Sequence, residues 1–300
     1  MKVDCSEIIE FLGLDCLNKK DFKITSIKPP NDLNDGCFTL LTRLNEFDEI
    51  FKDDLGINTL AIIPYELKEK VKNTSVTFLF SNDVRTDFVK GMHRIMATPF
   101  VPKISKSALI KTNISITKNI KIGENVILSG NIEIGEECEI KDNVVINGKV
   151  KIGNNVRIKS GTIIGQSGFN YVNDDDGNPL EFIHIGEVEI GNNVDIGACV
   201  SIAQGTLGKT IISENVKIDD QSHIAHNVII GKNTSILAGT VISGSSVIGQ
   251  NSWLSPNCSI IDHIHIGDNV KIGIGCTIIK SVPDNSVVME RLKYFNIKKR

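Results

Sequence analysis

A large aliphatic residue occupies every sixth position along two long stretches of this 300-residue chain. An α-helix repeats every ~3.6 residues and a β-strand every ~2, so neither explains a six-residue spacing. Such a period is typical of a solenoid, in which each short strand buries one side chain before the chain turns a corner. The two series are Ile104, Ile110, Ile116, Ile122, Leu128, Ile134, Ile140, Ile146, Ile152, Ile158, Ile164, and Ile212, Ile218, Ile224, Ile230, Ile236, Ile242, Ile248, Leu254, Ile260, Ile266, Ile272, Ile278.

Smaller residues follow the same six-residue period. The position two residues before each large aliphatic residue is mostly small or β-branched, and three successive hexads would make one triangular coil. Glycines often come directly after the large residue, and we expect them to supply the permissive backbone angles of the corners. These are Gly123, Gly135, Gly153, Gly165, Gly191, Gly197, Gly231, Gly249, Gly267 and Gly273.

Composition restricts the class of protein. With 41% hydrophobic and 23% charged residues the chain resembles ordinary globular proteins, and a net charge of −3 does not suggest a nucleic-acid partner. We expect no signal peptide, because the first residues lack an apolar core, and no membrane span. Seven cysteines are scattered without CxxC pairs. They predict buried thiols in a reducing cytoplasm, with no disulfide framework, metal site or cofactor.

The chain divides into three predicted parts. Residues 1–98 lack the hexad period and read as a small α/β domain, with helices over CSEIIEFLGL and 84–96 and strands over DFKITSI, LAIIPY and SVTFLF. Residues 103–281 form the solenoid, which we expect Pro283 to end. Residues 282–300 form a short tail, whose Met289, Leu292 and Phe295 predict one helical stripe.

Two interruptions break the period. The interval from Ile164 to Ile190 is four hexads and two further positions, and the interval from Ile202 to Ile212 is one hexad and four further positions. The intervening segments cannot stay in the coil and should protrude as loops. Loops on a rigid scaffold often carry binding groups.

Five of the six histidines, namely His184, His223, His226, His263 and His265, lie in or beside the second half of the coil. Gly244 follows His226 by three hexads and should lie one coil further on the same face. An imidazole beside an open backbone N–H pairs a general base with an oxyanion donor. His263 follows His226 by two coils and one position, so these three positions predict a groove along the coil axis, suited to a long acyl thioester.

At these residues a family resemblance appears. The run IDDQSHIAHNVIIGKNT (218–234), with GQSGFNYVNDDDGN and IGACVSI upstream, resembles the UDP-3-O-acylglucosamine N-acyltransferases of lipid A biosynthesis. The resemblance implies a left-handed parallel β-helix that assembles as a homotrimer. It also implies His226 as general base, Gly244 as oxyanion donor and His263 near the acyl donor. Further substrate- or donor-binding positions within these runs are Asn227, Asp219, Gln221, Phe169 and Tyr171.

The chain departs from the family pattern in three places. Ala203, Gln204 and Gly205 replace an Asp-Arg-Gly segment. In the first domain the nucleotide-binding aromatic and the Asn-Pro-Lys-Tyr after it are replaced by Leu40 and residues 43–46, with Phe47 one place late. Leu40 and Phe47 are therefore the predicted nucleotide-binding positions. Only the segment 284–300 follows Pro283, where the family continues into a helical extension that helps to bind acyl carrier protein.

These features together predict an enzyme that transfers an acyl group from coenzyme A or acyl carrier protein to the amine of a nucleotide-linked amino sugar. The product would serve lipid A or surface-polysaccharide synthesis. One alternative is a non-catalytic hexad scaffold or binding protein. Another is a zinc hydratase of the γ-carbonic anhydrase type, although Gly231 stands where its second histidine is needed. The sugar, nucleotide, acyl length, donor and the group that orients His226 stay open.

Overall fold

The computed structural model of the chain describes residues 2–43, 47–51, 56–71 and 75–289. The chain forms two compact units, Met1–Pro99 and Phe100–Arg300. Each unit has its own hydrophobic core. Among the described residues, no helix is both long and apolar enough to cross a bilayer.

The first unit is a five-stranded sheet in the order β2-β7-β6-β5-β4, parallel except for the β2–β7 pair. Along β6, Leu60 and Ile62 face α1 and α3, whereas Ala61 and Ile63 face the opposite core with α2. This alternation follows from the two-residue period of a strand. The elements are β1 (Val3–Asp4), α1 (Cys5–Leu12), β2 (Asp15–Leu17), β3 (Lys23–Ile24), β4 (Ser26–Ile27), β5 (Cys37–Leu40), α2 (Phe47–Ile50), β6 (Thr59–Pro64), η2 (Tyr65–Lys70), β7 (Val76–Ser81) and α3 (Val84–Met96).

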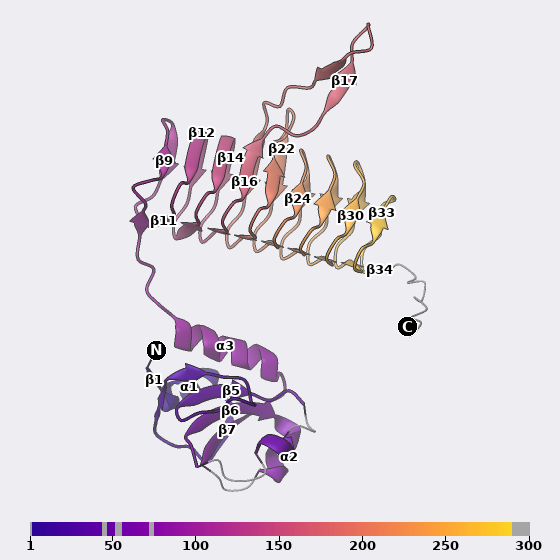
Figure 1. Cartoon of the computed structure of the whole chain (residues 1–300). Helices are drawn as coiled ribbons and strands as arrows, with labels where there is room; N and C mark the ends of the chain where they lie inside the picture. Colours follow the sequence, from indigo (N-terminus) through magenta and orange to yellow (C-terminus); the bar gives the residue numbers. More distant parts are fainter. Residues whose placement is uncertain (1, 44–46, 52–55, 72–74, 290–300) are drawn as a thin grey trace, which may run out of the picture. The chain divides into compact units, whose positions relative to one another are not determined.

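The second unit is a parallel β-solenoid of short strands (Figure 1). Strands pair with the equivalent strand of the next coil, for example Leu128 with Ile146 and Ile224 with Ile242, which is the predicted offset of three hexads. The predicted fold class is confirmed: mainly β, with a small mixed α/β region at the N-terminal end.

The coil has three faces, as the triangular prediction requires. The first face holds β9 (Leu109–Ile110), β12 (Ile127–Ile134), β14 (Val145–Ile152), β16 (Ile163–Gln166), β21 (Ser201–Ala203), β24 (His223–Ile224), β27 (Val241–Ile242), β30 (Ser259–Ile260) and β33 (Thr277–Ile278). The second holds β10 (Ile114–Ile116), the later halves of β12 and β14, β19 (Glu187–Ile190), β22 (Lys209–Ile212), β25 (Ile229–Ile230), β28 (Val247–Ile248) and β31 (His265–Ile266). The third holds β8 (Lys103–Ile104), β11 (Ile120–Ile122), β13 (Cys138–Ile140), β15 (Arg157–Ile158), β20 (Asp195–Ile196), β23 (Lys217–Ile218), β26 (Ser235–Ile236), β29 (Trp253–Leu254), β32 (Lys271–Ile272) and β34 (Val287–Val288).

Glycine is needed at these corners for a different reason from the one predicted. Of the predicted glycines only Gly165 has a positive φ, of 84°; the left-handed corner residues are mostly asparagines, such as Asn233 and Asn251. Their side chains form a ladder, in which Asn233 Nδ2 donates to Asn251 Oδ1 at 3.0 Å. At Gly249 a Cβ would lie 2.4 Å from the Gly267 carbonyl oxygen. Most of these glycines are needed because adjacent coils approach closely.

The sequence predicted that the solenoid ends at Pro283, but the structure continues it beyond that residue. Val282 forms a parallel bridge with Ile266, and β34 pairs with β32. The Val282 N–H donates to the His265 carbonyl and its own carbonyl accepts from Gly267, so these two ladder hydrogen bonds do not require an N–H at residue 283. Most of the predicted helical tail, 290–300, lies outside the described residues.

The two interruptions leave the coil as predicted. Residues 165–186 extend as a hairpin, in which β17 (Tyr171–Asn173) pairs antiparallel with β18 (Pro179–Glu181) (Figure 1). The second interruption, residues 203–210, packs against the base of this hairpin. The Ile185 N–H donates to the Thr206 carbonyl at 2.8 Å, and the Glu187 N–H donates to the Gly208 carbonyl at 3.0 Å.

Candidate active site at the His226 corner

His226 lies at the corner between the first and second faces, where β24 turns into β25. Ile224 and Ile230 are fully buried on either side of this corner and anchor it in the core. His226 itself is half-buried. The hexad register therefore presents the imidazole at the edge of the solenoid.

Asn227 sets the tautomer of His226. The Asn227 Oδ1 atom accepts hydrogen bonds from the Thr206 N–H at 3.0 Å and the Thr206 hydroxyl at 2.8 Å. A backbone N–H can only donate, so it fixes the orientation of the Asn227 amide. His226 Nδ1 lies 3.1 Å from the same Oδ1 and must be the donor. In the neutral ring Nε2 is then unprotonated, as a general base requires.

Gly244 lies directly against this ring. A Cβ at residue 244 would lie 2.6 Å from His226 Cε1 and 2.8 Å from Nε2. The Gly244 carbonyl accepts from the His263 N–H at 3.0 Å. Its own N–H donates to no partner within the described part of the chain. A free base nitrogen and a free backbone donor thus stand on neighbouring coils.

A second imidazole, His184, contacts the first. The two ring centroids are 5.3 Å apart, with an interplanar angle of 71°. His184 is only 5% exposed, and desolvation together with the nearby His226 lowers its pKa. The hexad arithmetic did not select His184, although it belongs to the histidine cluster.

The 203–210 loop anchors the backbone of His184 and the residue next to His226, Asn227. Gln204 Nε2 donates to the His184 carbonyl at 2.8 Å, while Thr206 binds Asn227. Thr210 Oγ1 accepts from the Asn227 N–H at 2.9 Å. Thr206 and Thr210 were not predicted as site residues. The only sequence signal was the irregular interval between Ile202 and Ile212.

The remaining predicted residues of the coil fall into two groups. His263 lies above Gly244 on the same corner, as predicted, with its imidazole exposed and 3.9 Å from the Asp262 carboxylate. Asp219 and Gln221 lie instead at the preceding corner, between β23 and β24. A single chain therefore does not bring these two to His226.

Phe169 and Tyr171 lie on the hairpin, next to the site's edge. Their ring centroids are 4.9 Å apart, and Phe169 is 88% exposed. Gly168, which precedes Phe169 in the chain, lies against the imidazoles: a Cβ there would be 3.0 Å from His226 Cδ2 and 3.1 Å from His184 Nε2. The hairpin base therefore covers both rings.

The predicted nucleotide positions in the first unit need a correction. Phe47 is 4% exposed, and its ring packs against Phe51 and Phe78 at centroid distances of 5.7 and 6.2 Å. A buried ring has no free face for stacking on a nucleotide base, so Phe47 belongs to the core. Leu40 ends β5 and is half-buried. Residues 44–46 lie outside the described residues.

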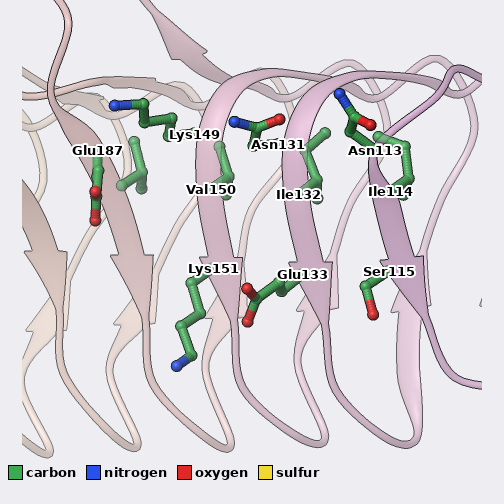
Figure 2. Close-up of a pocket in the computed structure, with 11 residues that line it drawn as sticks. Asn113, Ile114, Ser115, Asn131, Ile132, Glu133, Lys149, Val150, Lys151 and Glu187 are labelled. Carbon is green, nitrogen blue, oxygen red and sulfur yellow. The ribbon is translucent and has the colours of Figure 1, made fainter.

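A separate depression of about 730 Å³ lies on the second face. Figure 2 shows its polar lining, including Glu133, Lys149, Lys151 and Glu187 from three strands. It is lined by none of the predicted site residues. Within the described part of the chain, no group of three or more His, Cys, Asp or Glu side chains is placed to hold a metal ion.

Comparison with known proteins agrees with the fold. The model of the bacterial transferase hexapeptide (six repeats) family matches residues 131–166, 209–244 and 245–280. The Francisella novicida UDP-N-acetylglucosamine acyltransferase structure is similar at a TM-score of 0.57 and 26% identity, over 62% of this chain and 67% of that one. The chain therefore has the hexapeptide repeats and the solenoid fold of this class of transferases.

Sequence relatives identify the family within this class. The UDP-3-O-acylglucosamine N-acyltransferase of Campylobacter lari is 39% identical over 82% of this chain and 79% of its own length. The enzyme of that name from Cytophaga hutchinsonii is 51% identical over 28% of this chain, and the match covers only 24% of the relative. The chain belongs to the UDP-3-O-acylglucosamine N-acyltransferase family.

Proposed function

We propose that the protein transfers an acyl group from a thioester to the amine of a UDP-linked 3-O-acylglucosamine, in lipid A biosynthesis. The observation that carries this proposal is the chain from Thr206 through Asn227 to His226. In the neutral ring this chain of hydrogen bonds leaves Nε2 without a proton, beside the unpaired Gly244 N–H. Relatives named for this reaction support the choice of substrate.

The proposed reaction uses both groups in turn. His226 Nε2 takes a proton from the sugar amine as its nitrogen attacks the thioester carbonyl carbon. The Gly244 N–H donates to the oxyanion of the tetrahedral intermediate. When the C–S bond breaks, the imidazolium returns its proton to the departing sulfur, which yields an amide and a free thiol. The reaction needs no cofactor beyond the thioester, supplied by acyl carrier protein or coenzyme A, with His263 near the donor.

We further propose a homotrimer that completes the site. The outward side chains of the first face carry no formal charge: Leu109, Ile127, Val145, Ile163, Ser201, His223, Val241, Ser259 and Thr277. Seven of the ten outward residues in the paired register of the third face are charged, namely Lys103, Lys121, Glu139, Arg157, Asp195, Lys217 and Lys271. An uncharged face with exposed aliphatic residues suits contact with another copy.

The first unit is proposed to recognise the nucleotide, with Leu40 as its remaining predicted contact. All seven cysteines are free thiols, which supports the cytoplasm as the site of the reaction. The net charge of −3 does not suggest a nucleic-acid partner.

The test is turnover by the His226→Ala variant. General-base catalysis contributes about 10²–10⁴ in rate, so kcat should fall at least ~100-fold while the KM of the acceptor changes little. His265→Ala is the matched control, because this histidine points outward from the second face. Full activity in His226→Ala would exclude the mechanism, and no turnover by the wild type would favour the scaffold alternative.

A further inference from the structure

His184 has two buried nitrogens without a normal hydrogen bond. Among the described residues neither Nδ1 nor Nε2 makes a hydrogen bond of normal geometry, although the Phe182 carbonyl is near enough to raise the pKa of the ring. A buried polar group without a partner costs about 1–3 kcal/mol. Native proteins rarely retain such a group, so each case requires an explanation.

The backbone around His184 is held firmly. Its carbonyl accepts from Gln204 Nε2, and the next residue, Ile185, donates to the Thr206 carbonyl, both at 2.8 Å. These contacts place the ring edge against His226. Loose packing therefore does not account for the unpaired nitrogens.

Gly168 packs closely against both rings. A side chain there would come within 3.1 Å of His184 Nε2 and 3.0 Å of His226 Cδ2. Nε2 of His184 is thus the nitrogen nearest the glycine, on the side shared with His226. A group that took the place of Gly168 would contact both imidazoles.

The charges around His184 indicate the chemistry of that group. His226 and burial both oppose its protonation, whereas Glu181 on the hairpin and the Phe182 carbonyl favour it; the balance lowers its pKa. A neutral imidazole can accept a hydrogen bond from a hydroxyl or amine. A phosphate would instead require the imidazolium.

We propose that His184 is a further substrate-binding residue, whose Nε2 accepts a hydrogen bond from a hydroxyl or amine of the acceptor sugar. The inference rests on the proposed function. Because both nitrogens are enclosed in the free protein, binding must shift residues 167–169, where Gly168 provides conformational freedom. The substrate then supplies the missing partner.

The test compares His184→Phe, which keeps an aromatic ring, with His184→Gln, which keeps an acceptor. His184→Phe should raise the KM of the acceptor about 5- to 30-fold, as the loss of one hydrogen bond to a buried group implies, and His184→Gln should recover much of it. The Tm of His184→Phe should equal or exceed that of the wild type, because it removes two unpaired nitrogens. Thr39→Val is the matched control, because it removes a different buried polar atom without a partner, the Thr39 hydroxyl oxygen. It should likewise leave the Tm equal to or above that of the wild type, without changing KM.

Two results would overturn the inference. Wild-type KM in His184→Phe would show that the ring only packs against His226. A lower Tm in His184→Phe with an unchanged KM in the folded fraction would make His184 purely structural. The proposed function has a separate test: it would be wrong if the wild-type protein showed no turnover.

Discussion

Gly244→Ala adds one methyl group directly against the His226 ring. The new Cβ would lie 2.6 Å from His226 Cε1, whereas ordinary contact begins at 3.4 Å, so the ring must move by several tenths of an ångström. A misplacement of ~1 Å in a reacting group costs on the order of 10²-fold in rate. We therefore expect kcat to fall about 10- to 100-fold, although the Gly244 N–H is retained.

Backbone strain does not account for this effect. Asp262 occupies the equivalent position one coil later, and Gly244 is not among the residues with positive φ, so the corner accepts a side chain. The clash with His226 should also destabilise the fold by about 1–3 kcal/mol, as overpacking does.

The assay is a double-mutant cycle that combines kcat with thermal unfolding. In the His226→Ala background the clash is absent, and Gly244→Ala should then leave the Tm nearly unchanged. Wild-type kcat in Gly244→Ala, or an equal loss of Tm in both backgrounds, would refute the contact between these residues as the cause.

Three other changes test the remaining parts of the site. Asn227→Gly should lower kcat about tenfold or more, because the ring loses its acceptor, while Asn227→Asp, which keeps an acceptor oxygen, should retain activity. Ile163→Glu, on the uncharged first face, should dissociate the proposed trimer in sedimentation, whereas Lys271→Glu on the charged third face should not. His184 has a lowered pKa in the folded protein, so the unfolded chain binds its proton more readily. The free energy of unfolding should therefore decrease as pH falls below about 6.5, and this decrease should be smaller in His184→Phe when followed by denaturant titration.

Register explains which part of the site could be predicted from the sequence. A solenoid with one inward residue per hexad converts sequence distance into position, so an interval of three hexads placed Gly244 over His226. The same arithmetic placed His263 above Gly244. It also assigns Asp219 to the preceding corner, which the family resemblance alone did not indicate.

Prediction failed where position depends on packing between segments that share no period. Phe47 was placed by its sequence distance from a family motif, but its burial depends on how α2 packs with Phe51 and Phe78. The corner glycines were assigned to backbone angles because their contact with the next coil cannot be read from one hexad.

The two interruptions connect these observations. Each segment leaves the coil because its length is not a multiple of six, and each returns against the same corner. The 203–210 loop supplies the Thr206 hydrogen bonds that fix Asn227, and its Gln204 holds the His184 backbone. The hairpin supplies Gly168 over both imidazoles. The regular coil thus positions the proposed base and the proposed oxyanion donor, while the irregular segments select the tautomer of His226 and enclose its ring.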